Sequence, residues 1–156
     1  MAGDSWLHRS FFADPLVLLK LAVQIFTGRS PLPPYPDAVA RLPGVGELAV
    51  PQRILVASSL GLGAALYNPF AERGAGPVRF TAVAATAAHF WRHLPALLRG
   101  RFDDNMDLAH GFLSGRGESA EVQGIRGFAL DGEIYPADPT APITFSPGIE
   151  LRVLRA

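Results

Sequence analysis

Hydrophobic positions near the N-terminus follow the pattern of a helix. In "ADPLVLLKLAVQIFTGR", Asp14 stands where an N-cap is expected, Pro15 at the first helical position and Gly28 just past the end. The apolar positions cover most of the helix circumference and comprise Leu16, Leu18, Leu19, Ala22, Val23 and Phe26. We therefore predict a helix in this segment that packs against a sheet or a partner domain.

The following segment, "SPLPPYPD", holds four prolines within six residues. This spacing favours an extended polyproline conformation and is typical of a connector. Recognition of the segment as a peptide ligand through Pro31 and Pro34 is the alternative.

From Ile54 onward the pattern changes to short runs of β-branched and aromatic residues bounded by Gly, Pro or Asn, which predicts strands. In the last run, Ile149, Leu151 and Val153 alternate with charged residues, as expected for a sheet with one buried face. The predicted strands lie near 54–60, 78–85, 105–113, 120–130, 143–145 and 149–154.

A second helix is predicted between the strands, in "TAAHFWRHLPALLRGR", with Thr86 as the cap and Gly100 as the stop. Pro95 lies inside it, so the helix either begins late or is kinked there. Adjacent strands with a segregated helix indicate an α+β, mostly β fold and argue against a doubly wound parallel sheet. We expect an antiparallel β-sandwich-like domain with an N-terminal helix and one inserted helix.

The length of 156 residues suits a single domain, 1–156, with a helix and connector over 1–50 and a β-rich core over 51–156. The 14 basic residues balance 14 acidic ones, which gives no reason to expect a nucleic-acid partner. The absence of cysteine excludes disulfides and thiolate metal sites and fits a reducing compartment. The apolar run from Leu16 to Phe26 is interrupted by Lys20 and too short for a membrane span, so we expect a cytoplasmic protein.

Two stretches suggest a site but also have an ordinary structural explanation. "GLGAAL" at 61–66 resembles a dinucleotide loop but has leucine for its third glycine, so a glycine bend is favoured. Asp103, Asp104 and Asp107 could hold a hard cation, but ordinary turn chemistry is favoured.

His89 and His93 have the spacing of metal ligands on one helix face, but no third ligand is evident nearby. We favour a basic face that is solvated or meets anionic lipid headgroups, formed by these histidines with Arg92, Arg99 and Arg101. The opposite, anchoring face is predicted to consist of Phe90, Leu94, Leu97 and Leu98.

The stretch "FALDGEIYP" places two carboxylates, Asp131 and Glu133, beside an apolar run. On an extended segment these side chains would project to the same side, about 7 Å apart. This arrangement suits catalysis or a cation; the alternative is an Asp-Gly turn flanked by strands.

From about Pro51 to Ala156 the chain resembles the C-terminal domain of the diacylglycerol kinase family of lipid kinases, which includes bacterial and sphingosine-type enzymes. The resemblance rests on "RILVASSLGLGAALYNPFA", on "VRFTAVAATAAHFWRHLPALLRGRF", and above all on "FALDGEIYP" followed by "ITFSPGIELRVL". The N-terminal helix resembles one that precedes these strands in the family.

The resemblance implies that Asp131 is the general base that takes the proton of a lipid hydroxyl and that Glu133 assists it. A neighbouring carboxylate makes such a base a better proton acceptor. Gly132 would allow the substrate to approach the backbone closely. The family's Asp-Asp-Gly element, associated with a structural metal, is replaced by "AERGAGP", so no metal ligand is assigned.

ATP and Mg²⁺ are implied by the resemblance, since the family's N-terminal domain holds the nucleotide with a Gly-Gly-Asp-Gly-Thr motif. This sequence contains no such motif. We therefore expect the nucleotide-binding domain to be a partner in cis or in trans, with peripheral contact at the inner membrane face, and the chain alone to be inactive. The alternative is a non-catalytic lipid- or partner-binding β-sandwich; a carbohydrate-binding sandwich ranks last because Trp6 and Trp91 form no obvious platform.

Overall fold

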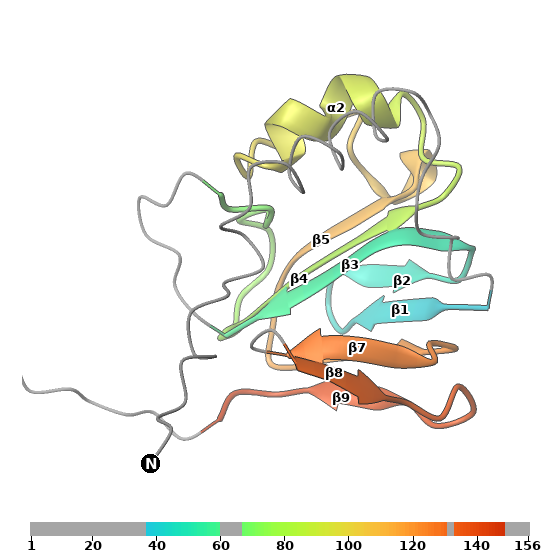
Figure 1. The fold of residues 1–156 in the computed structure, drawn as a ribbon. Coiled ribbons are helices and arrows are strands. Elements are labelled where there is room, and N and C mark those ends of the chain that lie inside the picture. The colour runs from blue at the N-terminus through green and yellow to red at the C-terminus, as the bar shows by residue number, and fades with distance from the viewer. Residues whose placement is uncertain (1–36, 60–66, 131–132, 149–156) are drawn as a thin grey trace, which may run out of the picture.

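The computed structural model describes residues 37–59, 67–130 and 133–148. They form two antiparallel sheets and a separate hairpin (Figure 1). The three-stranded sheet has the order β3-β4-β5 and consists of β3 (Gln52–Ser58), β4 (Val78–Ala84) and β5 (Phe112–Gly117). The four-stranded sheet has the order β2-β1-β6-β9 and consists of β1 (Val39–Leu42), β2 (Gly46–Leu48), β6 (Ala120–Gln123) and β9 (Ile143–Phe145). The hairpin pairs β7 (Gly127–Leu130) with β8 (Glu133–Pro136).

The main core lies between the two sheets. Alternate side chains of β4, those of Val78, Phe80, Ala82 and Ala84, point into it because successive residues of a strand face opposite sides. The four-stranded sheet contributes the buried side chains of Ala40, Leu42, Leu48, Ala120 and Val122. The molecule is therefore a sandwich of antiparallel sheets, as the sequence predicted.

A second core lies on the other face of the three-stranded sheet, beneath the helix α2 (Phe90–Leu97). Val83 of β4 and Phe112 of β5 pack there against Phe90, Leu97 and Met106. The fold is accordingly mostly β with one inserted helix. The predicted N-terminal helix, the connector prolines, the glycine segment 61–66 and the strand at 149–154 lie outside the described residues.

A buried polar cluster fixes the segment before β4 to the three-stranded sheet. Thr81 Oγ1 donates to the carbonyl oxygen of Pro69 at 2.6 Å and lies 2.7 Å from Ser114 Oγ. Since the single Thr81 proton is used, the Ser114 hydroxyl donates to Thr81, and it accepts from the Ala71 N–H at 2.9 Å. The Ser114 hydroxyl thus donates one hydrogen bond and accepts another within the fold.

Two strand predictions are wrong in their bounds. Within the predicted strand 105–113, the structure has a turn and the 3₁₀ helix η1 (Leu108–His110), and β5 begins only at Phe112. The predicted strand 120–130 is broken between β6 and β7. Gly124 causes the break, because it adopts φ 83° and a side chain there would meet the backbone of Asp37.

The region assigned to a connector also contains two strands, β1 and β2, which pair with each other and extend from the β6 edge. The inserted helix begins at Phe90 and not at Thr86, but Pro95 still lies inside it, as its sixth residue. Residue His89 precedes the helix with φ 49°, at the end of the turn segment that follows β4.

Candidate functional site

The β7–β8 hairpin carries the Leu-Asp-Gly-Glu stretch. Leu130 is paired directly with Glu133 and Phe128 with Tyr135. The chain therefore reverses direction between Leu130 and Glu133, which agrees with the alternative considered from the sequence, strands on both sides of a turn. Asp131 and Gly132 lie outside the described residues, so their predicted roles as base and substrate contact stay predictions.

Glu133 is exposed at the start of β8, and its Oε2 accepts a hydrogen bond from the Tyr135 hydroxyl at 2.9 Å. Tyr135 in turn stacks on Phe128, with ring centroids 5.6 Å apart and an interplanar angle of 20°. Phe128 packs against the main core. A chain of contacts thus runs from the core through two rings to the carboxylate, and it restricts the positions that the Glu133 side chain adopts.

The apolar residues of the hairpin are unusually exposed. Ile134 retains 84% of its accessible surface, and Leu130, opposite Glu133, retains 54%. Side chains of this kind are normally buried, and contiguous exposed ones mark contact sites for proteins, lipids or ligands. Leu130 shares a face of the hairpin with Glu133, and Ile134 projects from the other face, so both faces present an apolar group to a partner.

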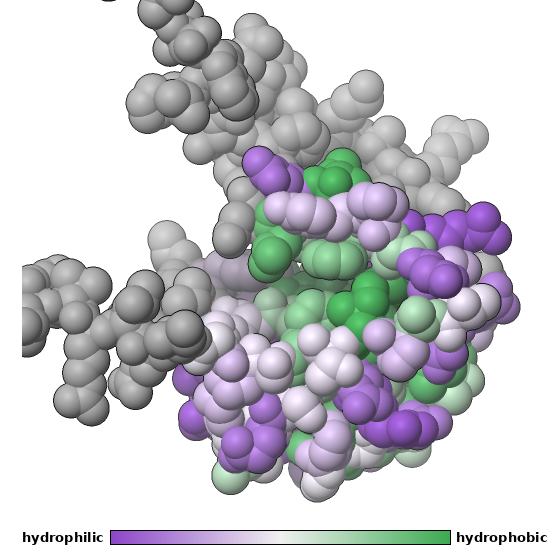
Figure 2. Space-filling view, turned by 90° about the horizontal axis from the view of Figure 1, so that it is seen from below, coloured by the Kyte–Doolittle hydropathy of each residue, from purple (hydrophilic) through white to green (hydrophobic). Residues whose placement is uncertain are grey.

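Apolar side chains also reach the surface at the edges of the sandwich beside the hairpin. Leu55 and Ala57 of β3 and Ile143 and Phe145 of β9 are half-buried against the main core. Figure 2, which views the molecule from the side of the hairpin and β9, shows apolar residues gathered in a hollow with polar residues around it. The molecule therefore has an apolar surface on the side of the hairpin and β9.

The other sequence candidates occupy structural positions. His93 is on the buried side of α2, edge-on to Phe112 with ring centroids 5.8 Å apart, whereas His89 is exposed before the helix. The predicted basic face is therefore wrong for His93, and the predicted anchoring face is wrong for Leu98, which is exposed. The helical period explains this, since Phe90, His93 and Leu97 form one stripe.

The acidic cluster before β5 shows turn chemistry, as favoured from the sequence. Asp103 Oδ1 accepts from the Asn105 N–H at 2.9 Å. Asp107 Oδ1 accepts from the backbone N–H of His110 at 3.0 Å and lies 2.7 Å from His110 Nδ1, and these hydrogen bonds lower the pKa of the Asp107 carboxyl. Across residues 37–59, 67–130 and 133–148, no three Asp, Glu or His side chains gather as a metal site.

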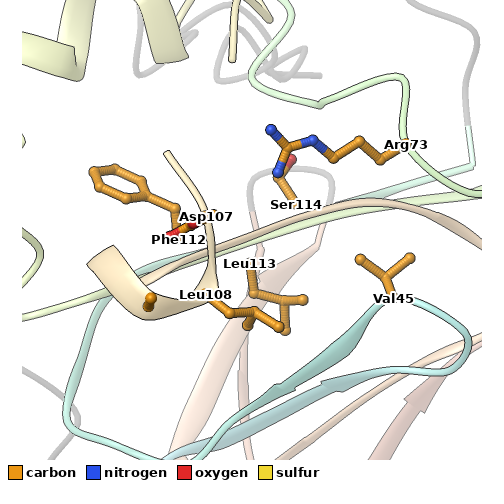
Figure 3. Close-up of a pocket in the computed structure, with 8 residues that line it drawn as sticks. Val45, Arg73, Asp107, Leu108, Phe112, Leu113 and Ser114 are labelled. Carbon is orange, nitrogen blue, oxygen red and sulfur yellow. The ribbon is translucent and has the colours of Figure 1, made fainter. Parts of the chain in front are cut away.

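A pocket that the sequence did not reveal lies on the opposite side of the sandwich from the β3 and β9 edges. It has a volume of about 400 Å³ and lies between β5, η1 and the turn that joins β1 to β2 (Figure 3). Val45, Leu108 and Leu113 supply apolar walls, and Arg73 and Asp107 supply charges. Of the residues that line it, only Asp107 is a candidate from the sequence, as a ligand of a cation.

Comparisons with protein-family models, with curated proteins and with solved structures returned no significant match to this chain. Among the helices that the structure describes, none is both long and apolar enough to cross a membrane.

Proposed function

We propose that this chain is the lipid-binding, catalytic-base half of a diacylglycerol-kinase-type lipid kinase. The observation that carries the proposal is the Leu-Asp-Gly-Glu stretch at the hairpin, where Glu133 is paired with the exposed Leu130 and the next residue, Ile134, is exposed on the other face of β8. A lipid alcohol has the complementary chemistry, since it presents one hydroxyl next to a hydrocarbon chain.

In the proposed reaction, Asp131 accepts the proton of the lipid hydroxyl as its oxygen attacks the γ-phosphorus of ATP. The new bond joins the lipid oxygen to phosphorus, and the bond between the γ-phosphorus and the bridging oxygen of ADP breaks. Glu133, oriented by Tyr135, supports the base electrostatically. The half-buried apolar residues along β3 and β9 would hold the hydrocarbon part of the substrate.

ATP and Mg²⁺ are assigned to the nucleotide-binding domain. The described residues offer no cluster of metal ligands, and the sequence has no Gly-Gly-Asp-Gly motif to hold phosphates. The two domains, in one chain or in two, would close on the hairpin. The protein would act in the cytoplasm with peripheral contact at the membrane that contains its substrate.

A second candidate is a non-catalytic lipid- or partner-binding sandwich. It is favoured by the solvated position of Glu133, whose carboxylate is already hydrogen-bonded by Tyr135. It is also favoured by the pocket described above, which lies away from the hairpin. The two candidates differ in turnover: the module binds lipid without transferring phosphate.

The test is a kinase assay of this chain together with the nucleotide-binding domain encoded upstream or supplied separately. We expect labelled phosphate to pass from ATP to a lipid alcohol in mixed micelles. Asp131→Asn should reduce kcat by at least about 100-fold, because the general base is lost, with lipid binding unchanged. Asp104→Asn, a change at an exposed aspartate outside the hairpin, is the matched control and should retain full activity.

Retained turnover in Asp131→Asn would remove this residue from the base role. Lipid binding without turnover in the unmodified two-domain protein would favour the non-catalytic module.

A further inference from the structure

The pocket beside β5 exposes part of the backbone of an edge strand. The Phe112 N–H donates to the carbonyl oxygen of Asp107 at 2.8 Å, and the Arg116 N–H donates to that of Arg73 at 2.6 Å. Both N–H groups therefore point away from β4. In an antiparallel strand, the backbone N–H and C=O groups of every second residue point to the same side. Ser114, midway between them, must present its N–H and C=O to the pocket that it lines.

No hydrogen-bond partner for this N–H is found among residues 37–59, 67–130 and 133–148. The Ser114 hydroxyl, in contrast, is occupied by Thr81 and Ala71 on the neighbouring face. The pocket thus contains a fixed backbone donor that is available to a ligand. A buried donor without a partner costs free energy, so a ligand acceptor there would be favourable.

Arg73 places a positive charge beside this donor. The neighbouring arginines Arg79 and Arg116 share one carboxylate, that of Glu72, at 3.2 and 3.5 Å. In the described parts of the chain, no carboxylate oxygen lies within 4.0 Å of the Arg73 guanidinium, whose contacts are two carbonyl oxygens at 3.4 Å. Figure 3 shows the Arg73 guanidinium reaching over Ser114. An arginine has five N–H donors, so several remain for a ligand.

The rest of the pocket is apolar except for one acidic group. The side chains of Val45, Leu108 and Leu113 form walls around the space below Arg73. The Asp107 carboxylate also lines the pocket, but it is turned to His110, from which it accepts two hydrogen bonds. The space suits a small molecule with an anionic head and an apolar body.

We propose that this pocket binds a small amphipathic carboxylate. Its carboxylate accepts hydrogen bonds from the Arg73 guanidinium and the Ser114 N–H, and its hydrocarbon part lies among Val45, Leu108 and Leu113. The planar arginine fork matches a carboxylate in geometry as well as charge. This site is separate from the hairpin, and it does not depend on the kinase proposal.

Octanoate is the probe, and amide chemical shifts of the isotope-labelled full chain are the readout. We expect saturable shifts of the Ser114 amide with octanoate and much weaker ones with octanol, which has the tail without the charge. Arg73→Gln should weaken octanoate binding by about tenfold or more, because charge-assisted hydrogen bonds are lost. Arg92→Gln, at an exposed arginine on α2, is the matched control and should bind as the unmodified chain does.

Leu108→Glu is a second variant that keeps Arg73 and adds a repelling carboxylate at the pocket wall; it should abolish binding. It decides the question if Arg73→Gln fails to fold, which the thermal unfolding midpoint would report. Shifts confined to the hairpin, equal binding of octanol, or unchanged binding in the folded variants would overturn the proposal. Binding of octyl phosphate with no binding of octanoate would overturn the carboxylate assignment.

Discussion

The β7–β8 hairpin and the β4–β5 pair are both antiparallel, but their environments are opposite. Five of six residues of β5 and six of seven of β4 are buried, and the side chains of β4 contribute to both cores. In the hairpin, β8 is exposed throughout, and Phe128 connects β7 to the main core. The β4–β5 pair therefore contributes more to the stability of the fold than the hairpin does. The exposed residues of the hairpin are available for contact with a partner.

Because burial differs in this way, substitutions in the two regions should have different effects. A change in β4 or β5 removes buried contacts and alters the free energy of unfolding. A change in the hairpin removes exposed groups, which typically shifts that free energy by less than about 0.5 kcal/mol. An effect of a hairpin substitution on function, with the fold intact, would then report directly on the proposed site.

Phe80→Ala should have the largest effect on folding. Phe80 is 1% exposed at the centre of β4, and truncating a buried phenylalanine costs about 3–5 kcal/mol through lost burial and the cavity left behind. Urea denaturation followed by circular dichroism measures the change. A loss below about 1 kcal/mol would mean that the core between the sheets is not packed as described.

Ser114→Ala should have an intermediate effect. It leaves the N–H of Ala71, which is 2% exposed, without its acceptor, and an unsatisfied buried donor costs about 1–3 kcal/mol. Thr144→Ala, on an exposed position of β9, is the control and should change the unfolding free energy by less than about 0.5 kcal/mol. Equal effects of the two substitutions would show that the buried polar cluster does not stabilise the fold.

Tyr135→Phe should have the smallest effect on stability and a visible one on catalysis. The substitution removes the hydrogen bond to Glu133 but keeps the ring that stacks on Phe128. If the proposed two-domain kinase is correct, kcat should fall by about threefold to tenfold, since a hydrogen bond to a charged group is lost, with an unchanged unfolding midpoint. Tyr67→Phe is the matched control at another exposed tyrosine. Unchanged kcat would show that Tyr135 does not orient the carboxylate.

The sequence predicted those strands whose pattern is local. β4 and β9 lie within one residue of their expected bounds, and β3 within two, because their β-branched and aromatic residues favour an extended backbone. β1 and β2 are short and include Ala, Gly and Leu, which carry little strand preference. The Pro43-Gly44 pair between β1 and β2 is a local turn signal for their hairpin that was missed. The pairing of β1 with β6, about 80 positions along the chain, has no local pattern.

The candidate site was predicted in part. The sequence identified the Asp-Gly pair between apolar runs, and its alternative, strands on both sides of a turn, agrees with the pairing of Leu130 with Glu133. The stacking of Tyr135 on Phe128 depends on the register of the hairpin and could not be deduced beforehand. The pocket beneath Arg73 joins segments from residue 45 to residue 114, so its parts are adjacent only in the folded chain.

The proposed function requires the β7–β8 hairpin to contact a lipid surface. Because the chain contains no cysteine, Ile134→Cys allows a single polarity-sensitive fluorophore to be attached at the most exposed apolar position of the hairpin. Glu118→Cys, in the exposed turn after β5, is the matched control. On addition of vesicles containing diacylglycerol, we expect the emission of the label at 134 to shift to the blue and that at 118 to stay unchanged. A label at 134 that remains in water while the vesicles bind the protein would contradict the claim.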